Sequence, residues 1–338
     1  YVLGGRAMEI VYDRDGLADY LSRHHPKRSP ASGACEANSQ GPEQSSGTIF
    51  LDRFLENAIE VDVDALCDGA EVWVGGIMQH VEEAGIHSGD SACVLPPHSL
   101  GVEMLDQIRV ATRAIALGVG AVGLINVQYA VFGGELYVIE ANPRASRTVP
   151  FVSKALGLPL AKLACRIMLG ARLADLGLPD ERTPLGHVCV KEAVMPFDRF
   201  DGFDARLGPE MRSTGEVMGI ARDFPTAFAK AQAASGAALP DGGTAFITVT
   251  DADKPAAAAI AQQLCDHGFE VIATHGTAEA IRRMGVPVRA INKIAEGSPH
   301  VLDAMVSGDV TLVVNTPTGS GARADGWEIR REAVARGI

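Results

Sequence analysis

The sequence of 338 residues has no apolar run as long as the roughly 18 residues that a membrane-spanning helix needs. Basic charge is also scarce: 30 lysines and arginines stand against 42 acidic residues, for a net charge of −12 and a pI near 5.2. An acidic surface of this kind argues against binding to the phosphate backbone of nucleic acids. No secretory signal peptide is visible at the amino terminus. We therefore expect no membrane and no nucleic-acid partner.

Cysteine is scarce too, and no two cysteines have the C-x-x-C spacing that is typical of zinc sites and redox motifs. Scattered thiols fit reduced side chains in a cytoplasmic enzyme better than a disulfide framework. Apolar residues make up 47% of the chain, enough for a substantial core, and the length predicts two or three domains. The six cysteines are Cys35, Cys67, Cys93, Cys165, Cys189 and Cys265.

Residues 22–48 are rich in proline, serine, glycine and charge without periodicity, which predicts a mobile surface insertion. A turn-rich stretch at 237–243 separates a first domain, residues 1–236, from a second, residues 237–338. In the first domain the pattern predicts strands at 7–12, 59–66 and 71–78, and helices near 99–118, 160–169 and 225–234.

The pattern changes after residue 243, where short apolar strands alternate with helices. Alternation at this pitch predicts a small parallel α/β sheet. The expected strands are 244–249, 270–273, 288–290 and 310–315, and the expected helices lie near 255–267, 277–284 and 298–307.

The most informative stretch is residues 123–147, which reads as two strands joined by a tight turn at Phe132, Gly133 and Gly134. Side chains alternate along a strand, so Glu140 and Asn142 project from one face, with Gln128 nearly opposite on the partner strand. One carboxylate and two amide oxygens form a hard-oxygen site that is suited to Mg²⁺.

Arg144 and Arg147 follow this hairpin and add two cations that can hold a phosphoryl group or a small anionic acceptor. For any single one of these polar residues, a solvated group on an edge hairpin is the simpler interpretation. All five on this spacing together indicate the catalytic floor of a phosphoryl-transfer enzyme.

The motif N-V-Q-Y-A-V followed by I-E-A-N-P-R-A-S-R resembles the ATP-grasp catalytic core, and the continuation to Lys154 narrows the resemblance to the large chain of carbamoyl phosphate synthetases. Further matches run in the family's order and cover nearly the whole chain except residues 22–48. They are YVLGGRAM from Tyr1, GIHSGDSA from Gly85, LGPEMRSTGE from Leu207 and ATHGTA from Ala273.

This resemblance implies an α/β protein: a second, α+β ATP-grasp unit followed by a Rossmann-like, methylglyoxal-synthase-like regulatory domain. It implies a cytoplasmic, glutamine-dependent ligase that phosphorylates carbamate with ATP to carbamoyl phosphate, for pyrimidine and arginine biosynthesis. The expected ions are Mg²⁺ or Mn²⁺, with K⁺ as a further candidate. Expected partners are a glutaminase small subunit and the amino-terminal half of the large chain. By this resemblance the chain is truncated at both ends and inactive alone.

The resemblance also assigns roles to individual residues of the first domain. Gln128, Glu140 and Asn142 bind the divalent ion, and Gln128 and Glu140 also contact ATP. Arg144 and Arg147 stand near the phosphoryl group and carbamate. The ATP site further includes Arg53 and Leu55 at the adenine, Glu60 at the ribose, and the loop of Gly85, Ile86, His87 and Ser88; without the family, Glu60 reads as an exposed strand-edge carboxylate.

Two further ligand sites are implied. Acidic positions Glu82, Asp90 and Glu192 match residues that bind the activator ornithine, although acidic surface residues are common. In the second domain, residues at strand ends and a helix amino terminus match a nucleotide effector site for UMP or IMP. These are Lys254, Thr274, Gly276, Thr277, Lys293 and Asn315, for which helix capping and solvated lysines are the alternative.

Two alternatives stay open for the function as a whole. One is another ATP-grasp ligase, such as a biotin carboxylase or a peptide-forming enzyme. The other is a nucleotide sensor that binds effectors without turnover. Methylglyoxal synthase activity itself is disfavoured, because the stretch 296–300 lacks the Gly-Gly-Asp setting that such enzymes need.

Overall fold

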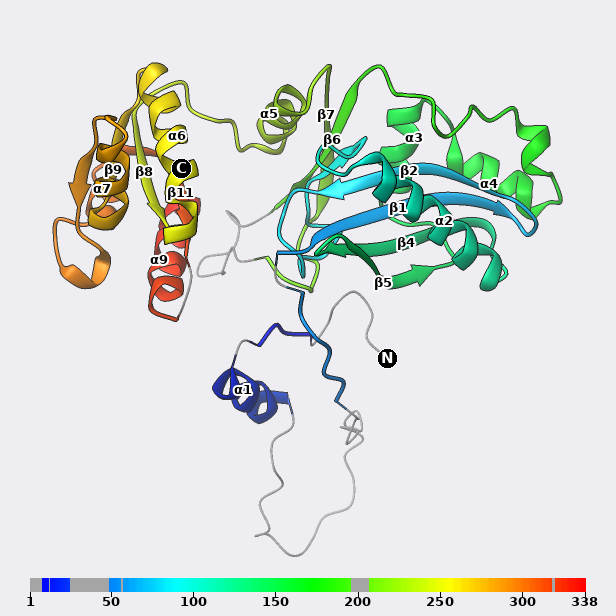
Figure 1. Cartoon of the computed structure of the whole chain (residues 1–338), viewed down its shortest axis with the longest axis horizontal. Helices are drawn as coiled ribbons and strands as arrows, with labels where there is room; N and C mark the ends of the chain where they lie inside the picture. Colours follow the sequence, from blue (N-terminus) through cyan, green and yellow to red (C-terminus); the bar gives the residue numbers. More distant parts are fainter. Residues whose placement is uncertain (1–7, 12, 25–48, 56, 196–206, 318–319) are drawn as a thin grey trace, which may run out of the picture. The chain divides into compact units, whose positions relative to one another are not determined.

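The computed structural model describes residues 8–11, 13–24, 49–55, 57–195, 207–317 and 320–338 (Figure 1). They fall into two compact units, one within residues 1–191 and 207–212 and the other within residues 192–206 and 213–338. This division by compactness differs from the boundary expected between residues 236 and 237. That boundary separates two domain families, and it stays a prediction. The 25–48 part of the expected insertion lies outside the described residues.

The first unit is built around an antiparallel sheet in the order β5-β4-β1-β2-β3-β6, and β7 continues the order beyond β6. Strand β6 itself crosses from the first unit to the second at Lys191 and Glu192. The strands are β1 Ile59–Asp68, β2 Val72–His80, β3 Cys93–Leu95, β4 Val122–Phe132, β5 Glu135–Asn142, β6 Val188–Val194 and β7 Gly215–Ala221.

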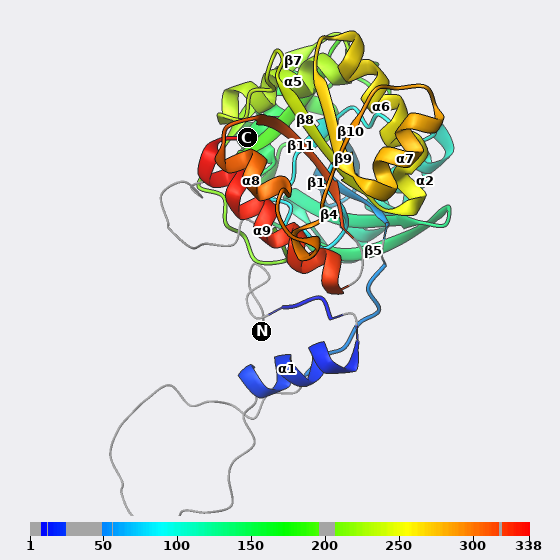
Figure 2. The ribbon, with the colours of Figure 1, turned by 90° about the vertical axis from the view of Figure 1, so that its left-hand side faces the viewer.

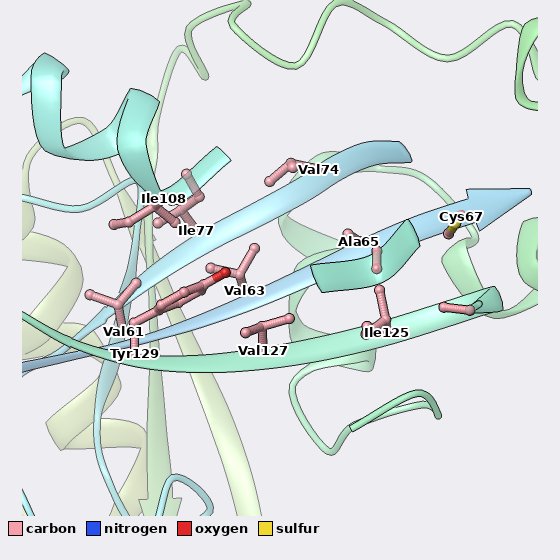
Figure 3. Packing of buried hydrophobic residues seen from close by; sticks show 12 residues of the cluster. Val61, Val63, Ala65, Cys67, Val74, Ile77, Ile108, Ile125, Val127 and Tyr129 are labelled. Atoms are coloured by element: carbon pink, nitrogen blue, oxygen red, sulfur yellow. The ribbon is translucent and has the colours of Figure 1, made fainter. Parts of the chain in front are cut away.

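The core of this sheet lies under α2, Val102–Gly118. Alternate residues of β1 and β4, including Val61, Val63 and Val127, are buried against Ile108 of that helix (Figure 3). Tyr129 is fully buried in the same cluster because its hydroxyl forms a 2.8 Å hydrogen bond with Thr112. The sheet's other residues therefore project from the opposite face, where α3, Val149–Leu156, and α4, Leu160–Met168, cover only one end.

The second unit contains α5, Phe224–Ser235, and a four-stranded parallel sheet in the order β10-β9-β8-β11. Helices α6 and α7 pack on one face of that sheet and α8 and α9 on the other (Figure 2). The elements are β8 Thr244–Val249, α6 Lys254–Asp266, β9 Glu270–Thr274, α7 His275–Arg283, β10 Arg289–Ile291, α8 Val301–Val306, β11 Val310–Thr316 and α9 Ser320–Arg336.

Most expected elements are confirmed to within a few residues, and so is the mixed α/β class with its separate parallel sheet. Two expectations are wrong. Residues 8–11 form no strand, and residues 22–24 belong to the helix α1, Arg14–His24, instead of the insertion. Arg23 holds that end of the helix through a bidentate contact with Glu9, a long-range pairing that local composition does not reveal.

Candidate functional site

The β4–β5 hairpin brings Gln128 close to its expected position opposite the second strand. Gln128 pairs with Glu140 and Asn126 pairs with Asn142, with a β-bulge just after Gln128. Directly paired residues of an antiparallel ladder project from the same face of the sheet. Gln128, Glu140 and Asn142 therefore share one face, as expected, and Asn126 joins them there.

Strand β1 extends this polar face. Asp62 pairs with Gln128 and Asp64 pairs with Asn126, so both aspartates lie on the same side as the hairpin carboxylate. Both are 1% exposed, whereas the intervening Val63 belongs to the core under α2. One strand thus presents a hydrophobic face to the helix and a carboxylate face to the candidate site.

The loop at 85–88 is brought to the hairpin, as the sequence predicts. The amide nitrogen of Gln128 donates to the Ser88 hydroxyl at 3.0 Å, and the main-chain N–H of Gly85 donates to Glu60 at 2.8 Å. The His87 pKa is lowered, first by burial and also by the charge of Arg147, against the opposing charges of nearby acids that include Glu140. Ile86 lies between these residues and is half-buried.

A buried histidine links two carboxylates of β1. His80 on β2 lies 2.9 Å from Asp62 through Nε2 and 3.4 Å from Glu60 through Nδ1. Burial lowers the pKa of His80, but Cys93, Asp62 and Glu60 outweigh it and raise the pKa overall. For Asp62, burial raises the pKa, but His80 together with hydrogen bonds from Gln128 and Asn126 outweighs it, so the net shift is downward. The pair is therefore an imidazolium and a carboxylate beneath Gln128.

The exposed edge of the site carries the predicted metal ligands and arginines. Arg144 Nη2 donates to Asn142 Oδ1 at 3.2 Å, and Asn142 Nδ2 donates to Glu140 Oε1 at 2.8 Å. Gln128 uses its amide nitrogen on Ser88, which leaves its carbonyl oxygen as the ligand atom. Arg147 lies nearby and is exposed.

This donor set fits Mg²⁺ or Mn²⁺ held by one carboxylate and amide oxygens, with water and phosphate completing the shell. It does not resemble an all-protein cage, because the described residues contain no cluster of three histidine, cysteine, aspartate or glutamate side chains that could hold a metal.

The predicted adenine side is apolar. Leu55 is half-buried beside a small cluster of Ala58, Ala84 and Ala130, which suits a flat heteroaromatic ring. Arg53 is exposed, so the predicted contact there falls to its main chain. Glu60 already accepts a hydrogen bond from Gly85, and its ribose contact stays a prediction.

Each of the predicted ornithine residues accepts a hydrogen bond within the protein. Glu82 and Asp90 lie in the first unit and Glu192 in the second. Burial raises the pKa of Glu82, although the Ala92 N–H donates to it at 2.6 Å. Asp90 accepts from the Arg212 N–H at 2.8 Å, and Glu192 accepts from the Gln232 side chain at 2.7 Å. Their shared ligand stays a prediction.

The second unit has a cavity of about 610 Å³ at the carboxyl ends of its parallel strands. Thr274 caps α7 there, its hydroxyl bonded to Thr248 at 3.1 Å. The cavity's residues include all six of the predicted effector site: Lys254, Thr274, Gly276, Thr277, Lys293 and Asn315.

The charged residues of this cavity include Asp251 and Lys254 around the start of α6 and Lys293 just after β10. The Lys254 ammonium lies 2.7 Å from the exposed Asp251. The Asp251 pKa is lowered, first by its hydrogen bond to Lys254 and also by the charge of Lys293, which places both lysines around one carboxylate. A Cβ built at Gly276 would lie 3.4 Å from Lys254 Nζ, so the ammonium is close to the amino terminus of α7. The arrangement suits a phosphate.

Several residues of the two sites have no role assigned by the sequence analysis. Asp62, Asp64 and Asn126 could have been found from the alternation of polar and β-branched residues along their strands, which marks a polar face. Nothing local signals His80 or the buried Lys191, which donates to the Ser88 carbonyl at 3.2 Å, because their partners come from other strands.

Comparison with known proteins adds independent findings. Residues 1–176 match the family described as "Carbamoyl-phosphate synthase L chain, ATP binding domain", and residues 256–338 match the MGS-like domain. Relatives named carbamoyl phosphate synthase large chain occur in Pseudomonas putida (52% identity over 338 residues), Archaeoglobus fulgidus (52% over 339) and Mycobacterium tuberculosis H37Rv (53% over 359). Each alignment covers 100% of this chain and 30 or 31% of the relative.

Among solved structures, the chain is similar to the biotin carboxylase domain of a single-chain bacterial carboxylase, with a TM-score of 0.43 and 19% identity. That match covers 55% of this chain and 48% of the other. Within the described part of the chain, no helix combines the length and apolar character needed to cross a membrane.

Proposed function

The chain belongs to the carbamoyl-phosphate synthase large-chain family, and we propose that its antiparallel sheet forms the floor on which carbamate is phosphorylated by ATP. One observation carries this proposal. The register of β4 and β5 sets Gln128 opposite Glu140 beside Asn142, and Ser88 and the following arginines meet that face. The chain spans about 30% of its relatives' length, so the reaction is proposed for an intact large chain that contains it.

In this reaction a carbamate oxygen attacks the γ-phosphorus of ATP, an oxygen–phosphorus bond forms, and the bond to the ADP oxygen breaks. The protein's work is positioning and neutralisation of charge, because phosphoryl transfer needs little covalent help. A bound Mg²⁺ or Mn²⁺ would supply positive charge that offsets the charge of the transferring phosphoryl group. Arg144 and Arg147 hold the anionic acceptor through guanidinium forks, and Glu140, Gln128 and Asn142 supply oxygen ligands.

Around this floor, Leu55 and the main chain at Arg53 bind adenine, Glu60 binds the ribose, and the 85–88 loop contacts the phosphates. Glu82, Asp90 and Glu192 bind the ammonium groups of ornithine in the activated enzyme. The intact ligase works in the cytoplasm with a glutaminase subunit and the amino-terminal half of the large chain, and supplies pyrimidine and arginine synthesis.

The parallel-sheet cavity binds a nucleoside monophosphate, UMP or IMP, and regulates the reaction without chemistry of its own. Two lysines around one pocket and the amino terminus of α7 support an anionic ligand there. The cavity is also the observation that favours a second candidate, a nucleotide sensor in which only this pocket is used.

The decisive test is ATP formation from carbamoyl phosphate and MgADP by an intact large chain that carries this segment. Glu140→Gln should abolish most of the reaction, whereas Glu135→Gln, the same change at the other end of β5, should leave it nearly unchanged. Nucleotide binding in the cavity without any ATP formation would favour the sensor. ADP formation from ATP that depends on bicarbonate or another carboxylic acid, with no ATP formation from carbamoyl phosphate, would favour a different ATP-grasp ligase.

A further inference from the structure

A buried carboxylate holds the segment that carries both site arginines. Asp64 on β1 is 1% exposed, and its Oδ1 accepts from the Ser146 hydroxyl at 2.7 Å and from the Asn126 amide at 3.0 Å. Its Oδ2 accepts from the Thr148 hydroxyl at 2.6 Å. The two hydroxyls also lie 2.7 Å from each other. The three hydrogen bonds to Asp64 are 2.6 to 3.0 Å long, and all three partners lie outside β1.

These contacts bracket Arg147. Ser146 precedes it and Thr148 follows it, so the main chain is tied to the sheet on both sides of the arginine. Residues 143–148 connect β5 to α3, and apart from the Asp64 contacts the Arg144 N–H donates to the Asn142 carbonyl at 2.7 Å. Arg144 and Arg147 themselves are exposed. Asp64 therefore ties this connection to the sheet, while the side chains of both arginines are exposed.

The anchor is costly for stability, which argues that it serves placement. Burial raises the pKa of Asp64 to about 6, even though Thr148, Ser146 and Asn126 lower it. A carboxylate whose hydrogen bonds do not fully offset its burial destabilises the fold at neutral pH relative to an apolar side chain. Three directed hydrogen bonds impose a defined geometry, which an apolar contact does not.

We propose that Asp64 is a positioning residue, which sets the placement of Arg144 and Arg147 by fixing residues 146–148 against β1 and β4. The proposal rests on the function proposed above for the two arginines. Asp64 touches neither substrate nor nucleotide, because it is buried below the connection and bonded to Ser146, Thr148 and Asn126.

The test removes the hydroxyls and keeps Asp64, in an intact large chain that carries this segment. Ser146→Ala combined with Thr148→Val should lower kcat/KM for carbamoyl phosphate on the order of 10- to 100-fold, the size expected for a misplaced positioning group. The KM for MgADP should stay within about twofold, since neither hydroxyl contacts the predicted nucleotide groups. Asp64→Asn, which keeps Oδ1 as an acceptor, should retain most of the activity that Asp64→Leu loses.

The control is Thr112→Val, which removes another fully buried, hydrogen-bonded hydroxyl in the same unit away from the arginine segment. It should destabilise the sheet without changing the KM for carbamoyl phosphate. A double-mutant cycle supplies the last arm: when Arg147 is already Ala, the hydroxyl changes should cost clearly less than in the parent chain, because only their effect through Arg144 remains. Equal losses in both backgrounds, or a loss that Thr112→Val reproduces, would overturn the proposal.

Hydrogen exchange separates this proposal from the function itself. The hydroxyl changes should speed amide exchange at residues 144–148 and leave β1 protected, whatever reaction the chain catalyses. If the unsubstituted enzyme forms no ATP from carbamoyl phosphate but exchange responds as expected, the proposed function fails and the anchoring role of Asp64 stands. Unchanged exchange would show that Asp64 does not hold the segment.

Discussion

The two sheets of this chain place their candidate ligand residues differently. In the antiparallel sheet, Asp62, Asp64 and Gln128 lie within strands, each one residue away from a side chain of the α2 core. In the parallel sheet, the cavity residues lie at the carboxyl ends of strands, as Thr248 and Thr274 do, or beyond those ends, as the two lysines do. The first site therefore shares its strands with the hydrophobic core, whereas the second site lies at the edge of the parallel sheet.

This difference sets how tightly each site is coupled to folding. A buried carboxylate within a strand needs partners from neighbouring strands, so a change there affects packing, charge and geometry together. A residue beyond a strand end can be replaced with little effect on the sheet beneath it. The two tryptophans allow each unit to be followed separately, because Trp73 lies on β2 and Trp327 on α9.

The largest effect should come from Glu140. It tests whether a site residue at the exposed edge of the antiparallel sheet is coupled to folding as tightly as the buried ones are. Glu140→Gln should reduce carbamoyl phosphate-dependent ATP formation by at least about 100-fold, because it removes the single carboxylate of the predicted metal site. Trp73 fluorescence should report nearly unchanged unfolding, since Glu140 is exposed. Near-normal turnover would exclude the assignment.

Asp64 should give the next largest effect, on stability. Its pKa is raised from 3.8 to about 6 by burial, so its contribution to stability is fully present below about pH 3.8 and is lost as the pH rises through about 6. Relative to Asp64→Asn, the parent chain should lose roughly 3 kcal/mol of unfolding free energy between about pH 4 and pH 7. Denaturant titration followed at Trp73, in a Trp327→Phe background, measures this.

Asp68 supplies a control of opposite sign in the same strand. Burial raises its pKa, but N–H donors from Leu173, Glu71 and Ala70 outweigh it, and the net shift is downward. Its contribution to stability is therefore present at neutral pH and lost on acidification, and Asp68→Asn should remove that loss. If Asp64→Asn and Asp68→Asn changed the pH dependence of stability in the same direction, burial would not be the cause of the raised Asp64 pKa.

Lys293 tests the separation between site and core in the parallel sheet. Lys293→Ala should weaken UMP or IMP binding on the order of 10- to 100-fold in the intact chain, because a charge-assisted contact to phosphate is lost. Unfolding followed at Trp327 should not change, since Lys293 is exposed. Calorimetric titration gives the affinity; an unchanged value would locate the effector elsewhere.

The smallest expected effect concerns Asp251, whose carboxylate forms an ion pair with Lys254. Asp251→Asn should tighten nucleotide binding by about threefold, because an exposed ion pair competes only weakly with a phosphate. Asp266→Asn, at the other end of α6, is the matched control. Calorimetry with uridine in place of UMP should show no such gain, and weaker UMP binding in Asp251→Asn would indicate that the carboxylate contributes to the site.

Local patterns in the sequence are sufficient for most of the framework. Period-two alternation in residues 59–66 and 123–142 predicts strands, and the Gly133–Gly134 turn predicts their hairpin, because these signals depend on neighbours in the chain. The turn alone would pair Gln128 with Ile139, so the pairing with Glu140 depends on the β-bulge after Gln128, which only the structure shows. The six effector residues share one cavity because strand ends of a parallel sheet meet at one edge.

Only the tertiary structure decided which groups lie beneath the site. His80 meets Asp62 and Glu60, and Asp64 meets Ser146 and Thr148, because β1 lies between β2 and β4 in the sheet. The segments that meet there are 18 to 84 residues apart in sequence, and no local preference encodes such a meeting. The sequence by itself therefore determined which faces carry polar groups, while sheet order and burial determined which carboxylates are paired and how strongly each holds its proton.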